Sequence, residues 1–244
     1  MNNLCLLAVL LSIPLGAITV TSNQIACNGT SGTTISCTLP SAPSQNNKLV
    51  LSVGGTSAAV TRVLTITETG VTWNLILQNL TQKYTAAWCG DVGASPSASI
   101  TLNMSATITT LVSANIVEIS SAPSCNALGG SATGFSGSNG TSGAPNSTGC
   151  CFNTPVKNEV AFSFAMVDTA AGFTTMTNGY TLLSSLDAVF IPAYLILPNK
   201  NSSGSTIWQG ISSASWAQQM TVLSSNGGST IGSNTTLGSK VTIQ

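Results

Sequence analysis

Short apolar or β-branched runs, separated by turn-forming residues, follow one another through the first half of the chain. Gly, Asn, Pro and Ser interrupt these runs at intervals of roughly 8 to 15 residues, a spacing typical of β-sandwiches and barrels. No segment combines helix caps with an apolar stripe of helical period. We therefore predict an all-β fold. The expected strands are residues 18–26, 33–39, 48–53, 60–67, 72–77, 84–89, 100–109 and 115–120.

The strand pattern repeats once along the chain, at an offset that falls slowly from 111 to 104 residues. The clearest pair is Asn-Lys-Leu-Val-Leu-Ser-Val at 47–53 and Asn-Glu-Val-Ala-Phe-Ser-Phe at 158–164. A drifting offset is what loops of different length produce in a duplicated fold. We therefore predict two tandem β-sandwich domains, residues 18–121 and 122–224. The other landmarks pair residues 71–75 with 179–183, 87–88 with 193–194, and 118–120 with 222–224.

Large aromatic residues stand at matching places in the two copies of the repeat. Such rings can form sugar-stacking platforms, but aromatics within the strands of a sandwich more often fill the core. We therefore expect these rings, and two further tryptophans in the later strands of the second copy, to be buried. The residues are Trp73, Trp88, Tyr180, Tyr194, Trp208 and Trp216.

Charged residues are scarce: six Lys or Arg and six Asp or Glu make up about 5% of the 244 residues, and there is no His. A soluble globular protein carries roughly 25%. Without imidazole the chain lacks the usual proton shuttle and the commonest metal ligand. The acids are isolated in the sequence, so no spacing nominates a pair of glycosidase carboxylates. We therefore predict that the protein is not an enzyme and has no cofactor and no metal site.

The scattered cations form no basic stripe, which argues against binding to nucleic acid. The polar surface must instead consist of hydroxyls and amides, because Ser and Thr together number 68. A folded monomer normally stays soluble through a charged surface. The composition therefore favours a surface covered by glycans or buried in a permanent assembly.

Seven Asn-X-Ser/Thr sequons offer attachment points for N-linked glycans. Asn103 lies on the opposite side of its expected strand from Leu102 and Met104, and most of the others lie in turn-rich segments. We predict that several of them are glycosylated. The sequons are Asn28, Asn79, Asn103, Asn139, Asn146, Asn201 and Asn234.

An uncharged, largely apolar run occupies residues 4–20 and is broken by Pro14 and Gly16. This pattern predicts a secretory signal peptide, residues 1–17, cleaved near Ala17. A membrane anchor is one alternative, although about 17 residues that include a proline is the lower limit for a span; a retained first strand is another. We expect an extracellular or cell-surface protein that meets the membrane only through this segment.

Seven cysteines occur, and cleavage of the leader would remove Cys5 and leave an even number. An even count suits disulfides formed in an oxidising compartment. A zinc site is disfavoured, because no two cysteines have the two-residue gap of zinc knuckles and ribbons. The six disulfide candidates are Cys27, Cys37, Cys89, Cys125, Cys150 and Cys151.

Spacing favours one bridge, between Cys27 and Cys37, across the turn between two expected strands. Connectivity of the other four cannot be deduced from sequence. Our first choice joins Cys125 to one member of the adjacent pair at 150–151 and Cys89 to the other, closing the Gly- and Ser-rich loop between them.

The two copies of the repeat differ at their starts. The first opens with the expected strands 18–26 and 33–39, whereas the corresponding part of the second, residues 126–155, is rich in Gly, Ser and Asn and has almost no alternation. The second domain should therefore lack an opening strand. This deficit would leave a sheet edge with unpaired backbone groups.

The tail, residues 225–244, has no counterpart after the first copy. Within it Leu237, Val241 and Ile243 alternate with polar residues, as in a strand. The tail can fold back to complete the second domain or pair with another subunit. Equally, cleavage near Ala17 can free residues 18–26 to insert into a neighbour, as in β-augmentation.

The repeat landmarks at 47–88 and 158–194 resemble immunoglobulin-like sandwich modules of secreted and phage-associated surface proteins. The leader, the scarcity of charge and the hydroxyl-rich surface resemble glycosylated extracellular filament subunits, including donor-strand pili and archaeal threads. The resemblance implies two tandem immunoglobulin-like β-sandwich domains after the signal-like segment. It also implies a structural filament subunit, joined head-to-tail to copies of itself by strand exchange. The alternative is a carbohydrate-binding adhesin or a virion surface module.

Overall fold

The computed structural model describes residues 18–56, 61–80, 83–120, 125, 159–167, 175–176, 179–197, 208–209 and 216–224. Regular structure in these residues consists of antiparallel strands. The strands are β1 (Thr19–Gly29), β2 (Thr34–Thr38), β3 (Lys48–Gly55), β4 (Val63–Thr67), β5 (Val71–Asn79), β6 (Tyr84–Val92), β7 (Ser99–Met104), β8 (Val112–Ser120), β9 (Glu159–Val167), β10 (Thr175–Met176), β11 (Thr181–Leu182), β12 (Phe190–Leu197), β13 (Trp208–Gln209) and β14 (Trp216–Ser224).

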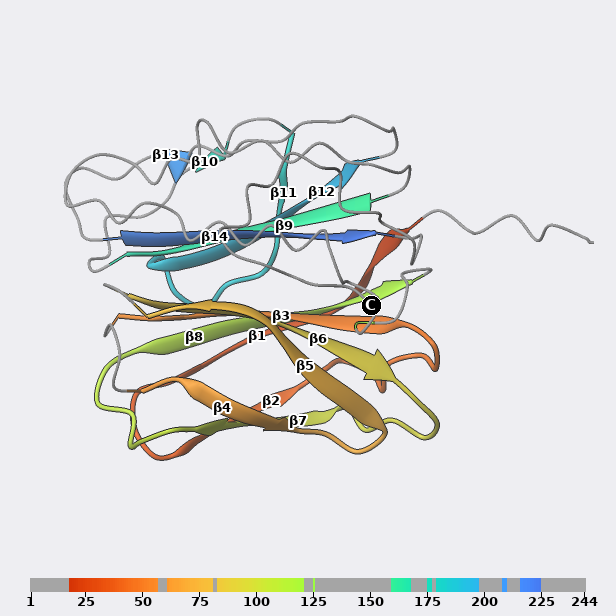
Figure 1. The fold of residues 1–244 in the computed structure, drawn as a ribbon, viewed down its shortest axis with the longest axis horizontal. Coiled ribbons are helices and arrows are strands. Elements are labelled where there is room, and N and C mark those ends of the chain that lie inside the picture. The colour runs from red at the N-terminus through yellow and green to blue at the C-terminus, as the bar shows by residue number, and fades with distance from the viewer. Residues whose placement is uncertain are drawn as a thin grey trace, which may run out of the picture.

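The strands form a stack of four layers (Figure 1). A five-stranded sheet, in the order β1-β8-β3-β6-β5, is covered on one face by the three-stranded sheet β2-β7-β4. The four-stranded sheet β11-β12-β9-β14 covers its other face, and the short pair β10-β13 lies beyond that. The prediction of an all-β fold is confirmed.

All eight strands expected in the first half are present, within a few residues of the expected bounds. The largest difference is at 100–109, where β7 ends at Met104. Beyond it, the backbone N–H of Ser105 still donates to the carbonyl of Arg62, at 2.8 Å. Alternation continues past the strand because Ile108 still packs into the core, where it is 2% exposed.

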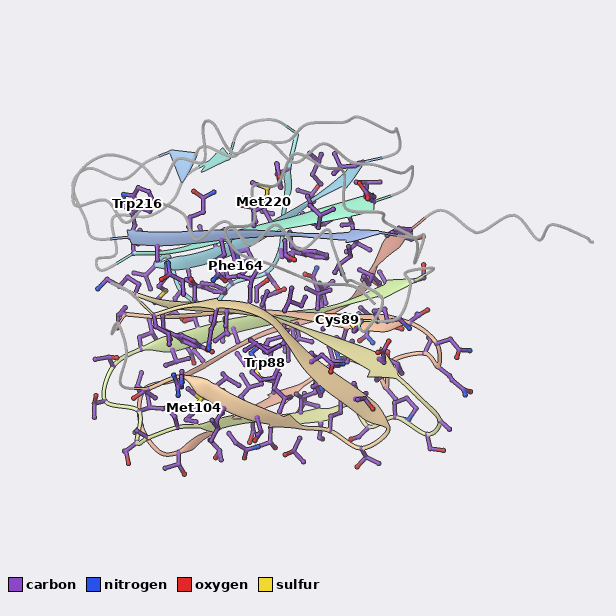
Figure 2. All side chains as sticks on the ribbon, in the orientation of Figure 1. Trp88, Cys89, Met104, Phe164, Trp216 and Met220 are labelled. Carbon is purple, nitrogen blue, oxygen red and sulfur yellow. A yellow bond between two sulfur atoms is a disulfide. The ribbon has the colours of Figure 1, made fainter. Side chains whose placement is uncertain are left out.

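The core between the five-stranded and three-stranded sheets, called here the sandwich core, is apolar on both sides. Leu49, Leu51 and Val53 alternate along β3 and point into it, as the two-residue period of a strand requires. Figure 2 shows Trp88 and Met104 in this layer, on opposite sheets. This arrangement is a closed β-sandwich of the kind expected from the first half of the sequence.

A second packed layer, called here the sheet interface, joins the five-stranded sheet to the four-stranded sheet. Val50 of β3 and Val117 of β8 pack there against Phe162 of β9. The sheets approach closely at Gly54, where an added Cβ would lie 2.7 Å from the Phe190 ring and 3.1 Å from Met166. Only glycine fits that position without displacing the second sheet.

Because the five-stranded sheet is covered on both faces, every residue of β3 is buried. Every residue of β9, in the four-stranded sheet, is buried as well. The four-stranded sheet of the second half therefore packs on the five-stranded sheet of the first. The two-domain, immunoglobulin-like arrangement is not confirmed. The boundary between residues 121 and 122 stays a prediction.

The duplication inferred from the sequence appears in the order of the strands. The landmark strands of the first copy lie in the order β5-β6-β3-β8, and their counterparts lie in the order β11-β12-β9-β14. These four strands thus correspond one to one. The five-stranded sheet has one strand more, β1, which lies outside β8.

Candidate assembly edge

The strands β8 and β14 are counterparts in the repeat, yet their surroundings differ. β8 is paired on one side with β3 and on the other with β1. In the described part of the chain, β14 has a strand neighbour, β9, on one side only. The opposite ends of the two sheets match, since β5 and β11 are both outermost. The outer edge of β14 is therefore the position at which the two copies differ.

In the first copy, β1 shows what fills this position. It runs antiparallel to β8, from Thr19 opposite Ser120 to Gly29 opposite Val112. The register shifts once between Val20 and Gln24. A strand along β14 in the equivalent place would complete a five-stranded sheet in the second copy as well.

β1 is fixed within its own chain. A disulfide joins Cys27 of β1 to Cys37 of β2, as expected from the spacing. Ile18 is 4% exposed and packs with Val117 of β8 and Leu223 of β14. The expectation that residues 18–26 insert into a neighbour stays a prediction, and their release would break five residue pairs with β8 and draw on a strand that is covalently bonded to β2.

A buried carboxylate fixes the same strand at its other end. Glu118 of β8 is 3% exposed and accepts a hydrogen bond from the Asn23 side-chain amide at 2.7 Å. It also accepts from the backbone N–H of Ser44 at 2.7 Å and from the Asn47 amide at 2.5 Å. Three donors compensate for the loss of water around this carboxylate. They tie β1, β8 and the loop before β3 together.

Residues 216–223 of β14 are buried on both faces of the strand. Trp216, Met220 and Val222 are buried on the face directed away from the five-stranded sheet, and Met220 lies 3.6 Å from the Tyr180 hydroxyl. Figure 2 shows Trp216 and Met220 on this outer side. Gln219 and Thr221 alternate with them and face the five-stranded sheet, and Gln218, which is 1% exposed, lies between Trp216 and Met220 on the outer face, so both faces of the strand carry a buried polar side chain.

Gln219 and Thr221 have no hydrogen-bond partners among the described residues. Gln219 is 1% exposed and Thr221 is fully buried, and neither amide atom of Gln219 nor the Thr221 hydroxyl is paired. A buried polar group normally finds a partner, and leaving it without one costs about 1–3 kcal/mol. Sequence analysis did not single out these residues. The signal was the break in apolar alternation at Gln-Gln-Met-Thr.

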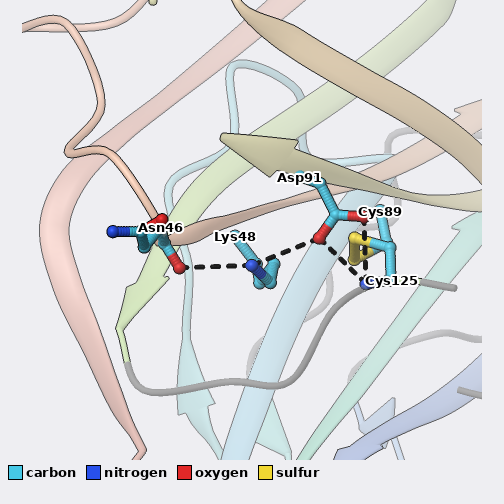
Figure 3. Close-up of polar contacts among 5 residues, drawn as sticks. All are labelled: Asn46, Lys48, Cys89, Asp91 and Cys125. Atoms are coloured by element: carbon cyan, nitrogen blue, oxygen red, sulfur yellow. Dashed lines mark hydrogen bonds and ion pairs between the residues drawn. A yellow bond between two sulfur atoms is a disulfide. The ribbon is translucent and has the colours of Figure 1, made fainter. Parts of the chain in front are cut away.

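The second disulfide corrects an expected pairing. Cys125 bonds to Cys89, so the expectation that either of them pairs with Cys150 or Cys151 is wrong. The bridge is seated by Asp91, whose two carboxylate oxygens accept from the Cys125 backbone N–H at 3.0 and 3.2 Å (Figure 3).

The same carboxylate pairs with a cation. Lys48 Nζ lies 3.2 Å from the Asp91 carboxylate and donates to the Asn46 carbonyl, also at 3.2 Å (Figure 3). Cys125 is thus bonded covalently to β6, and the carboxylate that accepts from its backbone N–H also pairs with Lys48 of β3. Cys150 and Cys151 lie outside the described residues.

The sequons differ in accessibility. Asn28 on β1 is exposed, and its side-chain nitrogen, the atom that would carry a glycan, donates to Asp187 at 3.1 Å. Asn103 is half-buried and donates to Thr67 on the outer side of the three-stranded sheet. Asn79 is 4% exposed, so the folded chain does not present it as a glycan acceptor. The remaining sequons, Asn139, Asn146, Asn201 and Asn234, lie outside the described residues.

The aromatic landmarks pack inward, as expected. Trp88 is 8% exposed in the sandwich core, and Tyr180 and Trp216 are 9% and 4% exposed in the second half. Trp73 and Tyr194 are half-buried against the same clusters. These rings therefore form no exposed sugar-stacking platform. Nothing is described of the Trp208 side chain.

The Trp73 ring forms a hydrogen bond with a buried acid, Glu68, and affects its pKa. Trp73 Nε1 donates to Glu68 at 3.1 Å, and the second carboxylate oxygen of Glu68 has no partner among the residues described. Burial raises the pKa of Glu68 from its ordinary value of 4.5 to about 7, although the Trp73 hydrogen bond partly opposes this shift.

The described acids stay dispersed in space. No group of three or more acidic or cysteine side chains could hold a metal ion in the described ranges, and none of those ranges contains a helix able to cross a membrane. A shallow groove beside the Cys27–Cys37 bridge is lined by Ile25, Asn28 and Leu186 among others, and has no aromatic lining.

Comparison with known proteins finds no protein-family model, no curated protein and no solved structure that matches the chain.

Proposed function

We propose that the protein is a structural subunit of an extracellular filament or surface assembly, in which subunits are joined by exchange of a β-strand. The acceptor in this proposal is the outer edge of β14, whose residues 216–223 are at most 4% exposed, so a donor strand must displace what covers them. One observation carries it: two sheets with the same order of four strands differ by a single strand, β1, at that edge.

The physics of sheet edges supports the proposal. An edge strand offers a row of backbone donors and acceptors that favours pairing with another chain. Addition of a strand satisfies these groups, and the side-chain pockets on both faces give specificity. If the donor strand comes from a different part of the molecule, the contact is head-to-tail and does not close. Repetition of such a contact builds a fibre.

The composition supports the same assignment. About 5% charge is little for the surface of a free monomer, whereas subunit contacts and glycans would both cover such a surface. Asn28 and Asn103 are the described sequons open to modification. The disulfides Cys27–Cys37 and Cys89–Cys125 suit an oxidising, extracellular location. Secretion and glycosylation are parts of the proposal.

Electron microscopy of the native, secreted chain tests this function. We expect regular fibres whose subunit repeat accommodates one copy of the chain. Sedimentation of the same material should show large species that persist on dilution. A monodisperse monomer that stays folded on dilution would contradict the proposal. Specific binding to a glycan array by that monomer would instead support the carbohydrate-binding alternative.

A further inference from the structure

We infer that Asn28 carries an N-linked glycan whose innermost sugars lie in the groove beside the Cys27–Cys37 bridge. This inference rests on the secretion and glycosylation included in the proposed function, and it does not depend on how subunits join. It is carried by the place of Asn28 in the wall of the groove, by the hydrogen bond that orients its side chain, and by a strongly exposed leucine in the same wall.

The groove lies on a side of the sandwich where two sheets end. β1 is outermost in the five-stranded sheet, β2 is outermost in the three-stranded sheet, and residues of both strands line the groove. Its volume is about 350 Å³, at the lower end of the range of roughly 300–1,000 Å³ found for small-molecule sites. The lining side chains that bear on the inference are Ile25 and Asn28 of β1, Ser36 and Thr38 of β2, and Leu186 between β11 and β12.

The lining matches the chemistry of a neutral sugar. A sugar ring presents C–H groups on its faces and hydroxyls around its rim. Leu186 is 61% exposed and Ile25 is half-buried, so they offer apolar surface that a ring face would cover. Ser36 and Thr38 are exposed, and their hydroxyls can donate to and accept from sugar hydroxyls. In the part of the chain that the structure describes, no charged side chain lines the groove.

The groove suits a tethered sugar better than a free one. It is shallow and has no aromatic ring among its described lining residues, so a diffusing sugar would find little to stack on. A sugar attached to a residue of the lining is held beside the groove, because a short covalent connection gives an effective concentration in the millimolar range. Weak contacts are then enough to keep it in place.

The geometry of Asn28 permits attachment without loss of a contact. Within the described residues its side-chain nitrogen makes one hydrogen bond, to Asp187 at 3.1 Å. A side-chain amide has two N–H groups, of which a glycan replaces one. The other N–H can still donate to Asp187, which follows Leu186 in the chain. The glycan therefore begins beside Leu186, at the wall of the groove.

The Asn103 sequon differs in this respect. Its side-chain nitrogen donates to the Thr67 hydroxyl at 3.0 Å and to the Thr65 hydroxyl at 3.2 Å, so both N–H groups have acceptors. A glycan on Asn103 would cost one of these hydrogen bonds, and the described residues that line the groove do not include Asn103. Asn28 is therefore the better acceptor of the two.

Attachment needs a donor that the secreting cell supplies, an oligosaccharide joined through its anomeric carbon to a lipid phosphate. A bond forms between Asn28 Nδ2 and the anomeric carbon, and the bond from that carbon to the phosphate oxygen breaks. The lipid phosphate leaves with the electron pair, and the amide gives up one proton. Thr30 completes the sequon that the transferring enzyme recognises.

Peptide mass spectrometry and hydroxyl-radical footprinting of the full-length, secreted chain test the inference. We expect a glycan on the peptide that contains Asn28. Thr30→Ala removes the sequon but keeps Asn28 and its bond to Asp187, whereas Thr30→Ser keeps the sequon and is the matched control. Oxidation of Leu186 should rise several-fold in Thr30→Ala and stay unchanged in Thr30→Ser. Leu182, which is 47% exposed on β11, is the internal reference and should react equally in each chain.

The possible failures are distinguishable. An unmodified Asn28 would overturn the inference and leave the filament proposal standing. A glycan at Asn28 with equal, strong oxidation of Leu186 in Thr30→Ala and the unchanged chain would place the sugars outside the groove. Equal, weak oxidation would assign the groove to another occupant, such as a neighbouring subunit, and would overturn the inference as well. Electron microscopy of the unchanged chain decides the filament proposal separately.

Discussion

The two faces of the five-stranded sheet carry different chemistry. On the sandwich-core face, β3 presents Leu49, Leu51 and Val53. On the sheet-interface face the same strand presents Lys48, Val50, Ser52 and Gly54, and neighbouring strands add Thr85, Ser113 and Asn115. The sandwich core is filled from both sides, whereas the sheet interface is filled mainly by Phe162, Phe164, Met166 and Phe190 of the four-stranded sheet.

This difference indicates how each contact is stabilised. Apolar burial from both sides gives the sandwich core most of its free energy. Small residues in the sheet interface allow close approach, and polar residues fix the alignment through directed hydrogen bonds. Asn115 donates to the Ser184 carbonyl at 2.8 Å, and Ser113 donates to Asp187 at 2.5 Å. The sheet interface therefore resembles a protein–protein interface within one chain.

The largest effect is expected in the sandwich core. Leu51→Ala removes a fully buried side chain and leaves a cavity between two sheets. The free energy of unfolding should fall by about 2–5 kcal/mol. Urea denaturation followed by fluorescence measures the change. Leu64→Ala, at a position 55% exposed, is the control and should change stability by less than about 0.5 kcal/mol. Equal effects would mean that the sandwich core is not the main source of stability.

The next effect is expected where the two sheets approach. Gly54→Ala places a methyl group against Phe190 and Met166, and the four-stranded sheet must shift to accommodate it. We expect a loss of about 1–3 kcal/mol in thermal unfolding. Gly55→Ala, whose nearest contacts would be at 3.5 Å, is the matched control and should be tolerated. If both substitutions are neutral, the sheets do not pack as closely as described.

Much of this architecture could be predicted from periodicity. The alternation in each run marked the strands, and the landmarks at 47–53 and 158–164 marked strands that occupy the same place in the two sheets. Periodicity reports that a face is buried and does not report what buries it. The run Lys-Leu-Val-Leu-Ser-Val therefore could not reveal that β3 is covered on both sides by different sheets.

The remaining errors concern contacts between distant parts of the chain. Cys89 and Cys125 are 36 residues apart, and the spacing of cysteines in the sequence does not report which of them the fold brings together. Asn79 lies in a turn-like sequence, yet it ends β5 and is buried. The expected lack of an opening strand in the second copy concerns residues 126–155, outside the described ranges, and stays a prediction. The unpaired Gln219 and Thr221 became visible only when their neighbours in space were known.

The pH dependence of stability should distinguish the sandwich core from the sheet interface. Glu68, which bonds to Trp73 beside the sandwich core, has a pKa raised to about 7 in the folded chain against 4.5 in the unfolded chain. The folded state therefore holds the proton more tightly, and stability should be greatest below pH 4.5, fall between pH 4.5 and 7, and then level off.

Glu68→Gln should remove this slope and stabilise the chain at pH 8 by about 1–2 kcal/mol, since water at the site screens the full effect. Denaturant midpoints of both proteins from pH 4 to pH 8 measure it. Glu118 provides the contrast, because its carboxylate has three donors and Glu118→Gln should destabilise the chain at pH 8. If the denaturant midpoints of the unchanged chain and of Glu68→Gln change with pH in parallel, Glu68 is not the source of the pH dependence.

The smallest effect is expected from a polar contact of the sheet interface. Ser113→Ala removes the hydroxyl that donates to Asp187, while the Asn28 amide still donates to the same carboxylate. The remaining donor and partial access to water limit the loss to about 0.5–1.5 kcal/mol. Ser36→Ala on the exposed face of β2 is the control. Hydrogen exchange gives the decisive readout, because β9 and β12 should lose protection while β2 and β7 keep theirs. Loss of protection in all four strands would show that both contacts unfold as one unit.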